Sequence, residues 1–126
     1  MIAGICGALC IGLGAMAAHA LTGKIPAENM QTFETASKYL FYKTIGLVIV
    51  AFIIEKDPSK YMKYAGWLFI TAIVLFSGSL YFLSLRPLMG IPNEEMRWVG
   101  AITPFGGISH ILAWIMIFIS AYKKRT

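Results

Sequence analysis

Long apolar stretches separated by short polar breaks dominate this chain. Four stretches, approximately residues 2–21, 35–54, 64–85 and 104–122, are each long enough for a helix to cross a bilayer about 30 Å thick. Lipid offers backbone polar groups no water to pair with, so each stretch is expected to be helical. No alternating pattern typical of strands recurs. The sequence therefore predicts an all-α, integral membrane four-helix bundle, with residues 1–126 forming a single domain.

The polar breaks carry residues that are typical of helix starts. Pro26 suits the first turn of the second helix, which is therefore expected to extend back to about residue 26 and to protrude from the bilayer. Asp57 and Pro58 are interpreted as the N-cap and first residue of the third helix. Thr103 and Pro104 are interpreted in the same way for the fourth helix.

The segment between the third and fourth spans contains the stretch "NEEMRWV". It predicts a short interfacial helix with Asn93 as its cap. Trp98 is expected at the headgroups, where amphipathic indole rings gather.

The first span also allows an interpretation as a secretory signal peptide. Ala18, His19 and Ala20 fit the small-x-small pattern of a cleavage site. However, no Lys or Arg precedes the apolar run, and the run is rich in glycine. We therefore expect a retained membrane span.

Composition agrees with a membrane protein. Hydrophobic residues make up 58% of the chain, charged residues 13%, and mean hydropathy is +0.70. Soluble domains are closer to half apolar and a quarter charged. The net charge of +5 does not indicate nucleic-acid binding, because the basic residues flank apolar spans and form no dense patch with interleaved aromatics. We expect contact with the lipid bilayer and no nucleic-acid partner.

Basic residues near the span ends predict the orientation. With four spans, both termini share one side of the membrane with the loop 55–63. That side holds Lys56, Lys60, Lys63, Lys123, Lys124 and Arg125. The other side holds Lys24, Lys38, Lys43, Arg86 and Arg97. Since Lys43 lies within a span and Lys38 near its end, the basic excess predicts that both termini are cytoplasmic.

Polar residues gather at one depth of the outer half of the bundle. At 1.5 Å per residue, Lys43 lies about 12 Å below the outer face, His110 about 10 Å, and Ser77 and Ser79 roughly 9–12 Å. Lys43 would either donate to such groups inside the bundle or extend toward the headgroups along its apolar stem. A functional site is the third interpretation. No Asp or Glu lies at this depth, which weakens the case for a proton or cation pathway.

The sequence offers no set of residues for metal or covalent chemistry. Cys6 and Cys10 are four residues apart, and His19 is about 13 Å along the helix from Cys10. Two thiols are too few ligands for zinc. The serines have no deep carboxylate with which to build a catalytic triad. We expect no metal, no cofactor, no catalytic residue and no enzymatic activity.

Small residues mark faces where helices approach closely. The first helix carries such residues at four-residue spacing, for packing either within the bundle or against another chain. They are Gly4, Ala8 and Gly12, with Gly7 beside them. Gly106 and Gly107 predict a second close contact near the start of the fourth span.

Four segments in order resemble the YgdD-like family of small bacterial inner-membrane proteins, which also has a eukaryotic transmembrane branch. They are "GAMAAHAL" at 14–21, "FETASKYLFYK" at 33–43, "FSGSLYFLSL" at 76–85 and "ITPFGG" at 102–107, with Trp114 following. The resemblance runs along nearly the whole chain and implies a four-span protein of the bacterial inner membrane. It also groups several residues as a related set: His19, Glu34, Tyr39, Tyr42, Ser77, Ser79 and Tyr81.

The chain departs from the family pattern at two positions. Lys43 stands where that pattern usually has His, and Ala17 stands where Gly is common. A shared function that needs an imidazole at this depth is therefore in doubt, unless His110 supplies it.

These features favour an accessory or scaffold subunit of a larger membrane complex, in contact with other membrane chains or copies of itself. The extramembrane portion is small, the first helix is lined with glycine, and deep carboxylates are missing. The alternative is a small transporter or channel that uses Lys43, His110 and Ser77. It would require an oligomer, because one bundle of 126 residues can hardly enclose a pore.

Overall fold

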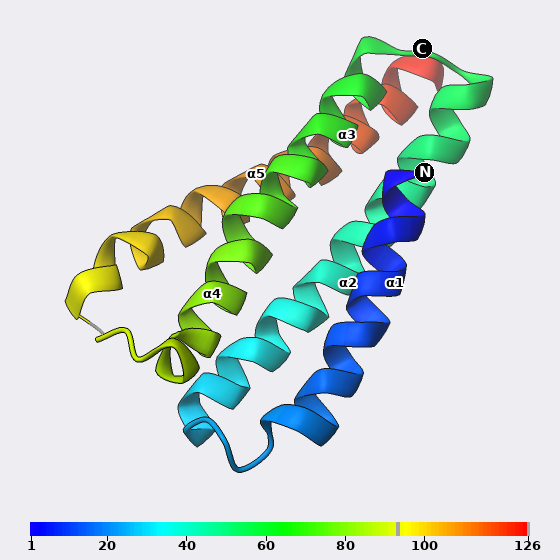
Figure 1. The fold of residues 1–126 in the computed structure, drawn as a ribbon. Helices are drawn as coiled ribbons and strands as arrows, with labels where there is room; N and C mark the ends of the chain where they lie inside the picture. Colours follow the sequence, from blue (N-terminus) through cyan, green and yellow to red (C-terminus); the bar gives the residue numbers. More distant parts are fainter. Residues whose placement is uncertain (93, 126) are drawn as a thin grey trace.

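The computed structural model describes residues 1–92 and 94–125, and helices account for most of them (Figure 1). The elements in chain order are α1 (Ile2–Met16), the π-helical turn η1 (Ala17–Leu21), α2 (Ala27–Lys56), α3 (Lys60–Ala72), the π-helical turn η2 (Ile73–Gly78), α4 (Ser79–Leu85), the 3-10 turns η3 (Arg86–Met89) and η4 (Glu94–Met96), and α5 (Arg97–Arg125).

Four continuous helical segments are long and apolar enough to cross a membrane. They are α1 with η1, α2, α3 through η3, and α5 with its preceding turn. This confirms the predicted all-α, four-helix membrane bundle. The second helix begins at Ala27, one residue from the predicted start near 26.

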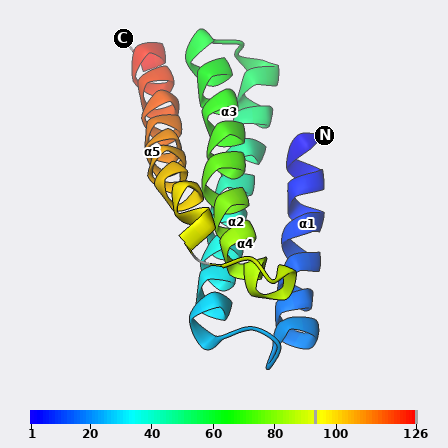
Figure 2. The same ribbon diagram turned by 60° about the vertical axis from the view of Figure 1, so that its left-hand side comes forward.

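α2, α3 and α4 lie in the middle of the molecule, and α1 and α5 lie on opposite sides of them (Figure 2). α2 packs against α1, α3 and α4, and α5 packs against α3, η2 and α4. α1 makes its extensive interhelical contact with α2. Both chain ends and the α2–α3 connection lie at one end of the bundle, and the loop 22–26 lies at the other (Figure 1).

Two predicted helix starts are wrong. Ser59 caps α3, because its Oγ accepts a hydrogen bond from the Met62 backbone N–H at 3.2 Å. Asp57 pairs instead with Lys124, at 3.1 Å between Oδ2 and Nζ. Pro104 lies inside α5, which already begins at Arg97. A proline has no N–H to donate to the carbonyl four residues earlier, but membrane helices tolerate this loss.

The predicted interfacial helix is also shorter than expected. The 3-10 turn η4 (Glu94–Met96) leads directly into α5, so Trp98 belongs to that long helix. Asn93, its predicted cap, lies outside the described residues. Trp98 is exposed, as expected of a side chain at an interface.

Two glycines let neighbouring helices approach closely. Gly46 of α2 faces Phe69 of α3, and a Cβ at Gly46 would overlap the phenyl ring. Gly106 of α5 faces the backbone of Leu75 and Phe76 in η2, where a Cβ would collide with main-chain atoms. These contacts place α5 directly against η2 and bring the polar residues of three helices together.

Candidate functional site

Lys43 is completely buried inside the bundle. Its exposed fraction is 0%, and its Nζ donates a hydrogen bond to Ser77 Oγ at 3.2 Å. The same nitrogen lies 4.1 Å from the ring centroid of Phe76 and 5.5 Å from that of Tyr39. An ammonium group is attracted to an aromatic face at such distances. Lys43 therefore takes the interior arrangement, and its side chain does not extend toward a membrane surface.

The π-helical turn η2 presents Ser77 and Phe76 to Lys43. One residue more per turn frees carbonyl groups from the α-helical pattern, and π-helical turns are frequent at functional sites. Ser79 Oγ lies 2.6 Å from the Leu75 carbonyl and 2.9 Å from the Phe76 carbonyl. It also lies 2.7 Å from Thr103 Oγ1. The two hydroxyls thus connect η2 to α5.

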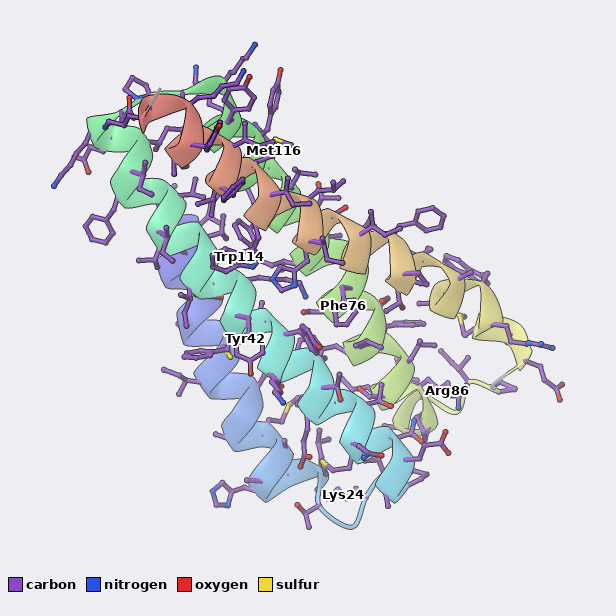
Figure 3. All side chains as sticks on the ribbon, turned by 180° about the vertical axis from the view of Figure 1, so that it is seen from behind. Lys24, Tyr42, Phe76, Arg86, Trp114 and Met116 are labelled. Carbon is purple, nitrogen blue, oxygen red and sulfur yellow. The ribbon has the colours of Figure 1, made fainter. Side chains whose placement is uncertain are left out.

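His110 lies beside the same aromatic rings. Its ring centroid is 6.2 Å from that of Tyr39 and 5.8 Å from that of Phe69. Its Nε2 accepts a hydrogen bond from Trp114 Nε1 at 3.1 Å. An indole N–H can only donate, so Nε2 carries no proton and the imidazole is neutral in this arrangement. Figure 3 shows Phe76 and Trp114 in the middle of the molecule, between α2 and α5.

Ser37 is the centre of a second set of polar contacts, which links α1, α2 and α4. Its Oγ donates to the Phe33 carbonyl at 3.1 Å and accepts from Tyr81 Oη at 2.9 Å. Cys10 Sγ donates to the Ser37 carbonyl at 3.5 Å. The rings of Phe33 and Tyr81 meet edge to face, with centroids 4.8 Å apart. These contacts fix the positions of three helices near the loop 22–26.

Asn29 holds the end of α4 against the start of α2. Its Nδ2 donates to the carbonyls of Leu83 and Ser84, both at 3.2 Å. Carbonyls in the last turn of a helix lack partners within that helix, so an amide from a neighbouring helix satisfies them. Sequence reasoning missed Asn29 and Ser37, because both lie among ordinary polar residues of the long second helix. The only signal for Asn29 was its place in the part of that helix expected to protrude from the bilayer, and Ser37, inside the predicted span 35–54, had no such signal.

The predicted polar residues separate into two groups. Lys43, Ser77, Ser79, Tyr39 and His110 come together through the contacts above. His19 and Glu34 are exposed and lie outside this group. Tyr42 is also exposed and reaches the group only through the Tyr39 ring, with centroids 5.8 Å apart. Glu34 borders a groove of about 260 Å³ between η1 and α2.

The glycines of α1 do not behave as one packing face. A Cβ at Gly7 would lie 3.8 Å from the Thr44 side chain of α2, an ordinary contact. At Gly4 and Gly12, an added Cβ would meet nothing within 4 Å, and Ala8 is exposed. Packing within the bundle therefore does not explain Gly4, Ala8 and Gly12, because α1 turns the opposite face toward α2.

Lys43 and Ser77 form a polar contact that is enclosed within the bundle. Among the described residues, His, Cys, Asp and Glu form no group of three that could hold a metal ion. Every buried side-chain nitrogen and oxygen in the described part of the chain has a hydrogen-bond partner. Satisfied polar contacts of this kind stabilise one helix arrangement.

Comparison with known proteins identifies relatives of unknown function. A family described as "Protein of unknown function (DUF423)" matches residues 13–107. The chain is 44% identical over 116 residues to UPF0382 membrane protein YwdK of Bacillus subtilis, covering 91% of this chain and 88% of that protein. It is 41% identical over 123 residues to UPF0382 membrane protein SH2409 of Staphylococcus haemolyticus, covering 94% and 93%. No solved structure matches the chain.

Proposed function

Because this chain belongs to the DUF423 family, whose function is unknown, we propose a role from the shape of its bundle: an accessory or scaffold subunit of a larger membrane complex. In this role the protein is non-enzymatic and acts by packing beside other chains. The family match supports a small membrane protein. The subunit role is supported by the outer face of α1.

The outer face of α1 carries glycines that this fold does not require. An added Cβ at Gly4 or Gly12 would meet no atom within 4 Å. Glycine in a helix interior is destabilising by about 0.5–1 kcal/mol relative to alanine. A face of small residues becomes useful when a second helix packs closely on it. A shallow groove of about 460 Å³ runs along this face past Ala8 and Gly12.

Two further observations support a non-enzymatic role. The connections between the long helices are short, so little chain is available to build a site for a soluble substrate. Lys43 and Ser77 are both buried, and their polar atoms already contact each other.

Purification of the native particle tests this role. The protein is extracted from its own membrane into polymer nanodiscs without overexpression, and the mass and composition of the particle are measured. We expect other chains at a fixed ratio. The double variant Gly4→Leu/Gly12→Leu should lose these chains and keep its helical circular-dichroism spectrum. The control Ala101→Leu, on an exposed position of α5, should retain them. A bare monomer from the native membrane would contradict the proposal.

The buried lysine supports a second candidate, a small transporter or channel. Lys43, Ser77 and His110 come from three different helical segments and lie around the same aromatic rings. Such a function predicts chloride or proton flux in reconstituted vesicles that falls in Lys43→Met and His110→Phe. Flux equal to that of empty vesicles, or unchanged in both variants, would contradict it.

We also propose a bacterial inner-membrane location, as the resemblance to the YgdD-like family implies, with both termini in the cytoplasm, as the basic residues near the span ends predict. The charges of the two ends support this orientation. The end with the termini carries six of the eleven basic residues and two of the six acidic residues, Glu55 and Asp57. The other end carries five basic residues, of which Lys43 lies within a span and Lys38 near its end, so the basic excess lies at the end with the termini.

A further inference from the structure

A narrow apolar groove opens between α2 and α3 at the end of the bundle that carries the termini. Its volume is about 220 Å³. Val50 and Ile54 line it from α2, and Gly66, Trp67 and Ile70 line it from α3. Lys63 lines the groove three residues after the start of α3.

Gly66 keeps this groove open. A Cβ at Gly66 would lie 3.5 Å from Val50 Cγ1, which is an ordinary contact, so helix packing does not demand glycine here. A larger side chain would instead fill the space between the helices. Trp67, next in the sequence, is 70% exposed and forms a wall of the groove. The result is an open apolar groove whose volume suits a segment of one acyl chain.

The rim of the groove is basic. Lys63 borders it, and Lys56 and Lys60 stand at the adjoining ends of α2 and α3, all three exposed. Asp57 pairs with Lys124 of α5. Glu55 is exposed and is not among the lining residues. The N-terminus of α3, with its partial positive charge, lies at the same level. An anion at this rim would meet complementary charge.

Lys63 lies where the headgroup of a phospholipid would be, and the apolar lining residues lie deeper, where its acyl chain would be. Ile70 lies about 10 Å further along α3 than Lys63, at 1.5 Å per residue. A phosphate beside Lys63 would therefore place the acyl chain against Gly66, Trp67 and Ile70. Anionic lipids attract basic residues near the membrane surface by about 1 kcal/mol each.

We propose that this groove is a binding site for an anionic glycerophospholipid. The phosphate lies beside Lys63, with Lys56 and Lys60 contributing to the positive field, and one acyl chain lies along Gly66 and Trp67. The residues that line the groove belong to α2 and α3, whereas the proposed subunit contact uses α1. Different variants therefore test the two proposals.

Fluorescence quenching of Trp67 tests the site in the full chain. Trp98 and Trp114 are changed to Phe, which leaves Trp67 as the single tryptophan. The protein is reconstituted into phosphatidylcholine vesicles that contain increasing fractions of brominated phosphatidylglycerol or brominated phosphatidylcholine. We expect phosphatidylglycerol to bind beside Trp67 about five-fold more strongly, the factor that corresponds to about 1 kcal/mol. Equal quenching by the two lipids would overturn the proposal.

Matched variants separate the headgroup contact from the acyl-chain contact. Lys63→Gln should remove the preference for phosphatidylglycerol, and Lys63→Arg should keep it. Gly66→Leu should reduce binding of both lipids beside Trp67. Lys24→Gln, at the opposite end of the bundle, should change neither. Circular dichroism and thermal unfolding establish that each variant is folded. A preference that survives Lys63→Gln, or quenching unaffected by Gly66→Leu, would also overturn the proposal.

Discussion

Lys43 keeps its amino group in the interior with one hydroxyl and two aromatic faces as partners. Moving an unpaired charge out of water costs several kcal/mol, and these contacts offset part of that cost. A buried charged group is often no more stabilising than an apolar side chain of similar volume. Removing only its partner leaves the charge without an acceptor. The two halves of the Lys43–Ser77 contact should therefore respond differently to mutation.

We predict this asymmetry in a double-mutant cycle. Ser77→Ala should lower the free energy of unfolding by about 1–3 kcal/mol, because it leaves a buried donor unsatisfied. Lys43→Met should change it by less than about 1 kcal/mol or increase it. In the double variant, the loss caused by Ser77→Ala should disappear. Unfolding in mixed micelles with increasing dodecyl sulfate measures all three. Additive effects would show that Lys43 and Ser77 are not coupled.

At the scale of elements, irregular backbone and close packing occur together. The π-helical turn η2 meets α5 at Gly106, two residues after Pro104. Ser79 and Thr103 connect the same two elements through their hydroxyls. Irregular helices are tolerated in membranes where neighbouring side chains satisfy freed backbone groups. Ser79, which contacts two carbonyls of η2, satisfies this requirement.

Adjacent glycines of α5 give a matched pair of substitutions. Gly106→Ala should destabilise the bundle by about 1–3 kcal/mol, because its Cβ would collide with the backbone of Leu75 and Phe76. Gly107→Ala should change stability by less than about 1 kcal/mol, because its Cβ would meet the Phe76 ring at 3.8 Å. Unfolding of both variants under the same conditions measures the difference. Equal stability would contradict the close contact.

The sequence predicts helices in this chain better than it predicts their ends. An apolar run of about twenty residues requires a helix in lipid, so four spans could be recognised from length alone. The predicted helix start at Pro104 was wrong, because the local sequence does not distinguish a proline in the first turn of a helix from a proline inside a membrane helix. The sequence did not predict the π-helical turns, because a change from i→i+4 to i→i+5 hydrogen bonds does not alter the hydropathy pattern along the chain.

The contact between Lys43 and Ser77 was within reach of sequence reasoning, but the contacts of Ser37 and Asn29 were not. Depth along a helix follows from residue count, which placed Lys43, Ser77 and His110 at one level. The direction in which a side chain points depends on how each helix is rotated. That rotation is set by packing, for example by Gly46 against Phe69. Hence Glu34 and Tyr42 were grouped with Lys43 but are exposed.

At the scale of the whole molecule, the two ends of the bundle differ in their polar contacts and in the number of exposed lysines. The polar contacts of Ser37 and Asn29 lie in the half that contains the loop 22–26, and those of Lys43 lie near the middle of α2. The contacts of Asp57 with Lys124 and of Ser59 with Ser120 lie at the other end. The other end carries most of the exposed lysines and both chain ends. Figure 3 shows Lys24 and Arg86 toward one end of the bundle and Met116 toward the other. Such asymmetry gives the bundle a defined orientation in a membrane.

We predict that both termini face the cytoplasm. A green fluorescent protein fused after Thr126 should fluoresce in bacterial cells, and alkaline phosphatase at the same site should be inactive. Phosphatase inserted into the loop 22–26 should be active. Replacing Lys56, Lys60 and Lys63 with Gln should weaken or invert this pattern, because basic residues near span ends set the orientation. An active phosphatase at the C-terminus of the unmodified chain would contradict the prediction.

α1 makes its extensive contact with α2, and the two cysteines of α1 can be used to measure how stable this contact is. Cys6 is buried, and the partly buried Cys10 donates its S–H to the Ser37 carbonyl, so the docked α1 shields Cys6 and part of Cys10. If α1 moves away from α2, both become available to a membrane-permeant maleimide. The rate of alkylation in intact membranes therefore measures how often α1 separates from α2, without any change to the sequence.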